Sequence, residues 1–141
     1  MESPAHRLVL PACVESLEEF RQFVRGGAAA CGIASAEIDK LDLVMEEILM
    51  NVARYAYVPE TGTAEVSYWQ TSHGRLRVEI SDQGRPFDPL AADPPDLSRG
   101  LADRPIGGLG VFLVRTLVGS MAYRREDGRN VLSFEFPGPV S

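Results

Sequence analysis

The stretch from Leu41 to Tyr57 has the clearest hydrophobic pattern in the chain. Glu47 and Asn51 are four residues apart in it, so on a helix they lie one above the other, away from the apolar stripe. A carboxylate and a carboxamide therefore point together toward whatever this side of the helix meets. Taken alone, such a pair is more often solvated. The apolar stripe repeats at helical spacing through Ile38, Leu41, Met45, Ile48, Leu49, Val52 and Ala56.

The rest of the chain predicts helices and short strands on both sides of this helix. Ser16 is a candidate N-cap with Glu19 at the capping-box position, Gly32 closes the helix that follows, and Ser35 is a candidate cap for the central helix. Other expected elements are a strand over 6–10, strands over 63–71 and 75–81 joined at 72–74, an apolar helix over 111–121, and a hairpin of 121–126 and 130–136 around Asp127-Gly128.

Asp82 stands at the end of an alternating row of apolar residues. Leu76, Val78 and Ile80 share one face of their predicted strand, and Asp82 continues that face. We expect this carboxylate to point toward the helix layer and to have a hydrogen-bond donor there, because an unpaired buried charge is costly. The alternative is an Asp that only begins a turn.

The segment after Asp82 has no regular period. Residues 88–106 are rich in Pro, Asp, Ala and Gly, and this length without periodicity suggests a lid or a disordered insert. Gly107-Gly108-Leu109-Gly110 then opens the apolar helix. Glycines at a helix N-terminus let backbone N–H groups approach an anion, although a tight turn is the more common role of such a run.

Composition narrows the functional classes. The chain has 141 residues, 45% hydrophobic and 24% charged, as expected for one soluble domain. The net charge of -6 argues against nucleic-acid binding. Cys13 and Cys31 lack metal-ligand spacing, so we expect free thiols in a reducing cytosol, with one disulfide as the alternative. No stretch reads as a membrane span or signal peptide, which predicts a cytoplasmic protein.

Together these features suit a nucleoside triphosphate, with Asp82 accepting from an exocyclic amine and Asn51 near a divalent cation. No GxxxxGK[ST] motif is present, which excludes a P-loop site. The sequence resembles the GHKL ATPase superfamily, which includes histidine kinases, DNA gyrase and mismatch-repair ATPases. Its N box matches Glu47 and Asn51, its first glycine box matches Asp82, Gly84, Pro86 and Phe87, and its second matches Gly107, Gly108 and Gly110 with Phe112 and Leu113.

The expected architecture is a single α+β domain over residues 1–141. It is a two-layer α/β sandwich, with a mixed but mainly antiparallel sheet of about five strands and three helices on one face. The nucleotide would lie between the helices and the 88–106 lid. Trp69 falls on the other face of the sheet, where a dimer or partner surface is one possible explanation and an isolated exposed aromatic is another.

Within the superfamily, the sequences DQGRPFD and GGLGVFLVR are similar to those of anti-sigma factor serine kinases. This resemblance implies ATP and Mg²⁺ as cofactors, a sigma factor and a STAS-type anti-sigma factor antagonist as partners, and a homodimer. It implies Glu47 as the general base and Asn51 as the magnesium ligand. The implied nucleotide-binding residues are Asn51, Asp82, Gly84, Pro86, Phe87, Gly107, Gly108, Leu109, Gly110 and Val111.

Two residues depart from the pattern of these kinases. Tyr55 stands where they often have a His, and Asn130 stands where they commonly have a Thr close to the phosphates. We expect nucleotide binding to survive both changes. Arg99 and Arg104 in the lid could approach the terminal phosphate, although solvated loop arginines are more common.

Two other functions remain open. One is a non-catalytic ATP-binding module that switches partners, although Glu47 favours an enzyme because a pure binder needs no base. The other is a histidine-kinase-like ATPase domain acting on a separate protein. The chain lacks a phosphoacceptor helix for that role, because His6 is on a predicted strand and His73 is in a turn.

Overall fold

The computed structural model describes residues 5–57, 61–86, 118 and 121–136. These residues form two long helices and five strands, in the order that the hydrophobic pattern predicts. The elements are β1 (His6–Pro11), η1 (Val14–Ser16), α1 (Leu17–Ala30), α2 (Ser35–Asn51), η2 (Val52–Ala56), β2 (Thr63–Gln70), β3 (Leu76–Asp82), β4 (Met121–Glu126) and β5 (Arg129–Phe136).

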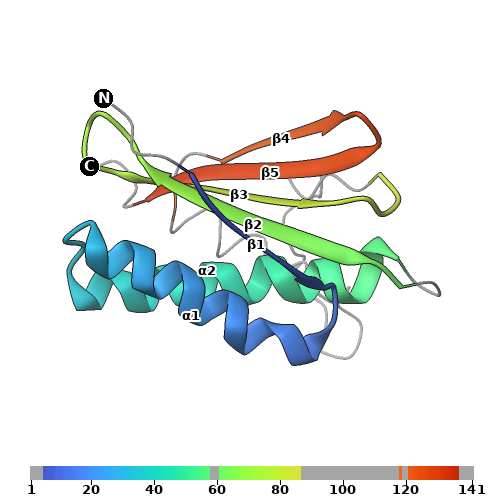
Figure 1. Cartoon of the computed structure of the whole chain (residues 1–141), viewed down its shortest axis with the longest axis horizontal. Helices are drawn as coiled ribbons and strands as arrows, with labels where there is room; N and C mark the ends of the chain where they lie inside the picture. Colours follow the sequence, from blue (N-terminus) through green and yellow to red (C-terminus); the bar gives the residue numbers. More distant parts are fainter. Residues whose placement is uncertain (1–4, 58–60, 87–117, 119–120, 137–141) are drawn as a thin grey trace, which may run out of the picture.

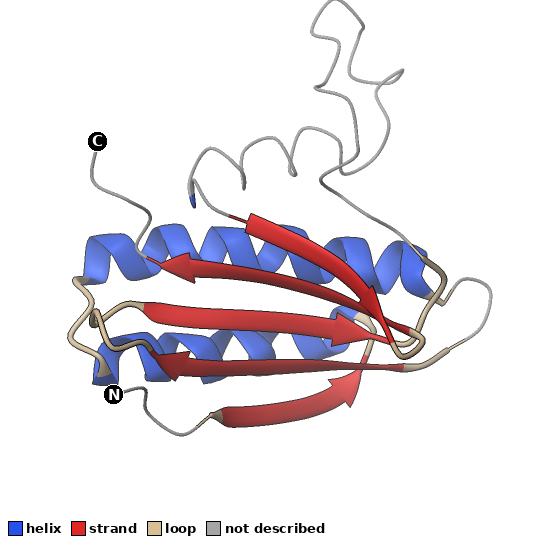
Figure 2. Cartoon of the chain, turned by 90° about the horizontal axis from the view of Figure 1, so that it is seen from above, coloured by secondary structure: helices blue, strands red, loops and turns tan. Residues whose placement is uncertain are grey.

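The five strands form one sheet in the order β1-β2-β3-β5-β4, and both helices lie on the same face of it (Figures 1 and 2). This confirms the predicted two-layer α+β architecture. Every pairing between the described strands is antiparallel, so the expectation of a mixed sheet is wrong for them. The count of three helices is also not confirmed. The third was expected over 111–121, where residues 111–117, 119 and 120 lie outside the described residues and Val118 is helical and buried.

The core lies between the helices and the inner face of the sheet. Phe20 of α1, Met45 of α2 and Phe134 of β5 are almost completely buried there. Removing such large apolar side chains from water is the main source of stability, about 1.5–3 kcal/mol for each. Gly27 lets α1 approach the sheet closely, because a Cβ at this position would clash with the ring of Tyr68.

The helix ends differ in part from the prediction. Gly32, with φ of +80°, follows α1 as expected. Ser16 is the N-cap of α1, but its side chain makes no capping hydrogen bond. Ser35 is the first residue of α2, and Ala34 is the N-cap because its backbone is extended. The expected Ser35 cap is therefore wrong.

An ion pair joins the two helices away from the sheet. Arg21 of α1 donates to both carboxylate oxygens of Asp42 in α2, at 2.9 Å and 2.6 Å. The hydrogen bond from Arg21 holds the pKa of Asp42 below its usual value. Cys13 and Cys31 both carry free thiols. None of the helices within the described ranges is long and apolar enough to cross a membrane.

Candidate functional site

Asp82 is the last residue of β3 and is only 7% exposed. Its Oδ1 accepts hydrogen bonds from the backbone N–H of Gly84, at 2.9 Å, and from Nδ2 of Asn130, at 3.0 Å. The prediction that this carboxylate points inward and meets a donor is confirmed. Both donors are neutral, and within the described part of the chain no hydrogen bond reaches Oδ2. One oxygen of a buried carboxylate is thus available to a further donor.

Asn130 is the residue of β5 directly opposite Asp82 in the sheet register. Its Nδ2 also donates to the carbonyl oxygen of Arg85, at 2.8 Å, and its Oδ1 accepts from the hydroxyl of Tyr123, at 2.6 Å. The resemblance relates the position of Asn130 to a Thr close to the phosphates, and in this structure the Asn130 amide contacts Asp82. Sequence reasoning missed Tyr123 altogether, because the contact depends on the pairing of β4 with β5.

The helix that carries Glu47 and Asn51 ends in a turn of π-helix, η2. Such wide turns occur often at functional sites. The carbonyl of Ala56 accepts from the backbone N–H of Arg85, at 3.0 Å, and the carbonyl of Tyr55 accepts from Nε of Arg85, at 2.9 Å. The end of the helix layer is therefore hydrogen-bonded to the segment that follows Asp82.

Gly84 is required where this segment meets η2. A Cβ at Gly84 would clash with the backbone carbonyl oxygen of Ala56. The glycine that the resemblance assigned to nucleotide binding thus also has a structural role, since it lets two backbone segments touch.

Tyr57 and Arg125 hold the segment from both sides. The hydroxyl of Tyr57 donates to the carbonyl of Thr63, at 2.6 Å, and accepts from the backbone N–H of Gln83, at 2.7 Å. Nη1 of Arg125 donates to the carbonyl of Gly84, at 2.8 Å. No sequence motif signalled the contacts of Tyr57 with Gln83 and of Arg125 with Gly84, because each joins residues far apart in the chain.

Glu47 and Asn51 lie in the C-terminal half of α2, with Asn51 only 8% exposed and Glu47 half-buried. Asn51 is thus not simply a solvated residue. The connection from this helix to Asp82 runs through Ala56 and Gly84. Pro86 is exposed at the end of the described segment. The other predicted site residues, Phe87, Gly107, Gly108, Leu109, Gly110 and Val111, and the proposed lid at 88–106 lie outside the described residues.

The donor set suits ATP and a phosphate-bound cation. Asp82 offers a buried acceptor to an exocyclic amine, as adenine binding requires. In the described ranges no group of three or more His, Cys, Asp or Glu side chains could hold a metal alone. Mg²⁺ commonly binds through one or two protein oxygens together with substrate phosphates. The carboxamide oxygen of Asn51 fits that arrangement.

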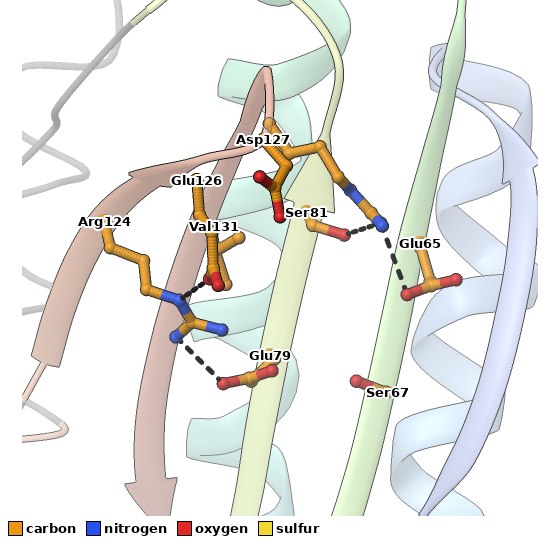
Figure 3. A pocket seen from close by; sticks show the side chains of 9 residues that line it. Glu65, Ser67, Glu79, Ser81, Arg124, Glu126, Asp127 and Val131 are labelled. Carbon is orange, nitrogen blue, oxygen red and sulfur yellow. Dashed lines mark hydrogen bonds and ion pairs between the residues drawn. The ribbon is translucent and has the colours of Figure 1, made fainter.

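The other face of the sheet carries a shallow pocket of about 280 Å³ (Figure 3). Arg124 pairs across it with Glu79, at 3.3 Å, and Arg129 pairs with Glu65, at 3.4 Å. None of the predicted site residues lines this pocket. Its lining consists of Glu65, Ser67, Glu79, Ser81, Arg124, Glu126, Asp127, Arg129 and Val131. On β3, the lining residues Glu79 and Ser81 alternate with the inward-facing residues Val78, Ile80 and Asp82. The pocket and the predicted site therefore lie on opposite faces of the sheet.

Curated relatives of this chain are protein kinases by name. The chain is 25% identical over 131 residues to the serine-protein kinase RsbW of Bacillus thuringiensis (strain Al Hakam). The aligned region covers 90% of this chain and 81% of the relative. RsbW of Bacillus anthracis (strain A0248) matches with the same identity and coverage.

A solved structure and a family model agree with these relatives. The RsbU and RsbW domains of Rv1364c from Mycobacterium tuberculosis superpose with a TM-score of 0.65 at 17% identity, covering 94% of this chain and 32% of that chain. At this identity the likeness supports the fold alone. A model of the histidine kinase-like ATPase domain matches residues 10–136. Because this match spans most of the sequence, the chain belongs to the GHKL-type histidine kinase-like ATPase family.

Proposed function

We propose that the protein is an ATP-dependent serine kinase that phosphorylates a STAS-type anti-sigma factor antagonist and sequesters a sigma factor. The observation that carries the proposal is the buried Asp82 at the end of β3, which is held by neutral donors. The segment that follows it is hydrogen-bonded to the end of the helix layer that bears Glu47 and Asn51. Family membership and the similarity to serine-protein kinases named RsbW support it. As a homodimer, the protein would present two such sites.

Each proposed residue has one role. Asp82 would accept a hydrogen bond from the exocyclic amine of adenine. Asn51 would offer its carboxamide oxygen to a magnesium ion, which would supply neutralisation of the phosphate charge. Glu47 accepts the proton of the attacking serine hydroxyl. The serine oxygen bonds to the γ-phosphorus, and the bond between the γ-phosphorus and the β-phosphate oxygen breaks, so ADP leaves. Phosphoryl transfer needs mainly such positioning and charge neutralisation.

The glycine-rich segment has the remaining role. Gly107, Gly108, Leu109, Gly110 and Val111 would offer backbone N–H groups to the phosphates. Phe87 and Pro86 would border the base, with Gly84 holding that segment against η2. The 88–106 segment would close over the nucleotide.

The test is transfer of labelled phosphate from Mg-ATP to candidate STAS-type antagonists, read by intact mass and retained label. We expect Glu47→Gln to slow transfer at least about 100-fold, as for loss of a general base, while ATP affinity stays within about twofold. Glu46→Gln is the matched control. Glu46 is also half-buried, but its charge acts on Arg21 on another side of α2, so transfer should be unchanged.

The other outcomes separate the alternatives. ATP binding without transfer to any antagonist would favour the non-catalytic partner-switching module. Transfer to a histidine of a separate protein would favour the histidine-kinase-like alternative. Absence of ATP binding would contradict the assignment of all three motifs.

A further inference from the structure

The orientation of the Asn130 side chain is determined by its partners. The carbonyl oxygen of Arg85 and the carboxylate of Asp82 can only accept, so both must face the amide nitrogen. The amide oxygen then faces the Tyr123 hydroxyl, which donates to it at 2.6 Å. Both N–H donors of the amide and its oxygen are therefore engaged by described residues.

Tyr123 is well placed to hold this arrangement. Its ring packs against the edge of the core, while its hydroxyl reaches Asn130 across the β4-β5 hairpin. The hairpin turn at Asp127-Gly128 has two successive positive φ angles, which matches the twist of the paired strands and keeps the register tight. The hydroxyl thus comes from a rigid element.

Asp82 is in turn held on one side only. Its Oδ1 accepts from Gly84 and Asn130, while Oδ2 receives no hydrogen bond from the described residues. The two nearby guanidinium groups are aimed at carbonyls, with Arg85 on Tyr55 and Arg125 on Gly84. A ligand at this position would find Oδ2 of Asp82 as a hydrogen-bond acceptor, while both N–H groups of Asn130 are engaged by Asp82 Oδ1 and by the Arg85 carbonyl.

We propose that Tyr123 and Asn130 are positioning residues that make the base site select an exocyclic amine over a carbonyl, that is, adenine over hypoxanthine. The inference rests on the nucleotide site of the proposed function and adds the source of its selectivity. The pair keeps both Asn130 N–H groups turned away from the base and keeps Oδ2 of Asp82 turned toward it. Loss of the Tyr123 hydroxyl would remove the hydrogen bond that it donates to the amide oxygen, which would loosen the Asn130 side chain and, through it, the carboxylate.

The experiment measures the dissociation constants of ATP and inosine triphosphate for the whole chain by calorimetry and compares their ratio between variants. For the wild type we expect at least about tenfold preference for ATP. Tyr123→Phe should reduce this preference about 3- to 10-fold, the range for one hydrogen bond. Asn130→Asp should reduce it further, because a second carboxylate replaces the donor beside Asp82.

Tyr68→Phe is the matched control. Tyr68 is also a half-buried tyrosine of the sheet, but its ring contacts His6 and Phe23 and not the Asp82 network. It should leave the preference unchanged. The ratio is measured within one variant, so a general loss of folded protein cannot imitate a loss of selectivity. If Asn130→Asp fails to fold, Tyr123→Phe decides the question alone.

Each remaining result has a distinct meaning. A wild type that binds neither nucleotide contradicts the proposed function itself. A wild type that binds both equally, or a Tyr123→Phe variant that keeps the full preference, overturns only this inference. Equal weakening of both nucleotides in Tyr123→Phe also overturns it, because the pair would then have a merely structural role.

Discussion

The carboxylates on the two faces of the sheet have different kinds of hydrogen-bond partner. On the outer face, Glu65, Glu79 and Glu135 are each paired with an arginine, at 3.4 Å, 3.3 Å and 3.5 Å. On the inner face, Asp82 accepts only from neutral N–H groups. In the described ranges no arginine forms an ion pair with it.

This difference does not come from a shortage of cations near Asp82. Arg85 and Arg125 both lie close to it, yet their guanidinium groups donate to backbone carbonyls. The outer carboxylates are paired with arginines within the protein, as Figure 3 shows for Arg124 and Glu79. The inner carboxylate has two neutral donors on Oδ1 and no hydrogen bond to Oδ2 from the described residues. The comparison teaches that the inner face holds a buried carboxylate with no cationic partner among the described residues, and the proposed ligand site rests on this feature.

The largest effect is expected for Asp82→Asn, which changes the inner carboxylate into a carboxamide. Its oxygen can still accept from Gly84 and Asn130, but its NH₂ group would then replace Oδ2 and meet the donor of adenine. We expect ATP affinity to fall about 100-fold, equivalent to about 2.7 kcal/mol, measured by calorimetry. Inosine triphosphate should lose less, because its carbonyl can accept from the new amide. ATP affinity equal to that of the wild type would contradict Asp82 as the base contact.

The inner row shows how far the sequence alone could predict the site. Alternation along β3 predicted that Asp82 points inward, because every second side chain of a strand shares a face. The helical pattern likewise predicted that Glu47 and Asn51 share one side of α2. Both inferences are local and need no knowledge of the sheet order.

The contacts around Asp82 could not be predicted in this way. Asn130 reaches it because β5 pairs with β3, and Tyr123 reaches Asn130 because β4 pairs with β5. Both depend on the order and register of strands that are distant in sequence. The π-helix after Asn51 also has no sequence pattern of its own, and it forms where Ala56 must meet Arg85 and Gly84. Sequence therefore located the carboxylate, and tertiary pairing decided its partners.

An intermediate effect is expected for Asp42→Asn. Asp42 is a carboxylate of the helix layer and, like the carboxylates of the outer face, it is paired with an arginine. Two hydrogen bonds from Arg21 lower its pKa in the folded state. The substitution should lower the free energy of unfolding by about 1–2 kcal/mol at pH 7, measured by urea denaturation. ATP affinity should not change, because Asp42 lies at the contact between α1 and α2 and is not part of the hydrogen-bond network around Asp82.

The pH dependence gives this prediction its sign. Because the folded pKa lies below the unfolded value of about 3.9, the charged form stabilises the folded protein fully above that value. The stabilisation is lost as the pH falls through the folded pKa. The difference in unfolding free energy between wild type and Asp42→Asn should therefore be constant from pH 7 to about pH 5 and shrink below about pH 4. A difference that persists at low pH would show that packing, and not charge, is responsible.

The smallest effect is expected for Glu79→Gln, the same chemical change on the outer face of the strand that carries Asp82. Glu79 loses its ion pair with Arg124, but the Arg124 side chain is 49% exposed and keeps Glu126 as a partner at 2.6 Å. Exposed pairs contribute little, so the free energy of unfolding should fall by less than about 1 kcal/mol. ATP affinity should match the wild type, in contrast to Asp82→Asn. If Glu79→Gln weakened ATP binding as strongly as Asp82→Asn, the two faces would not be functionally separate, and the outer pocket would have to be included in the site.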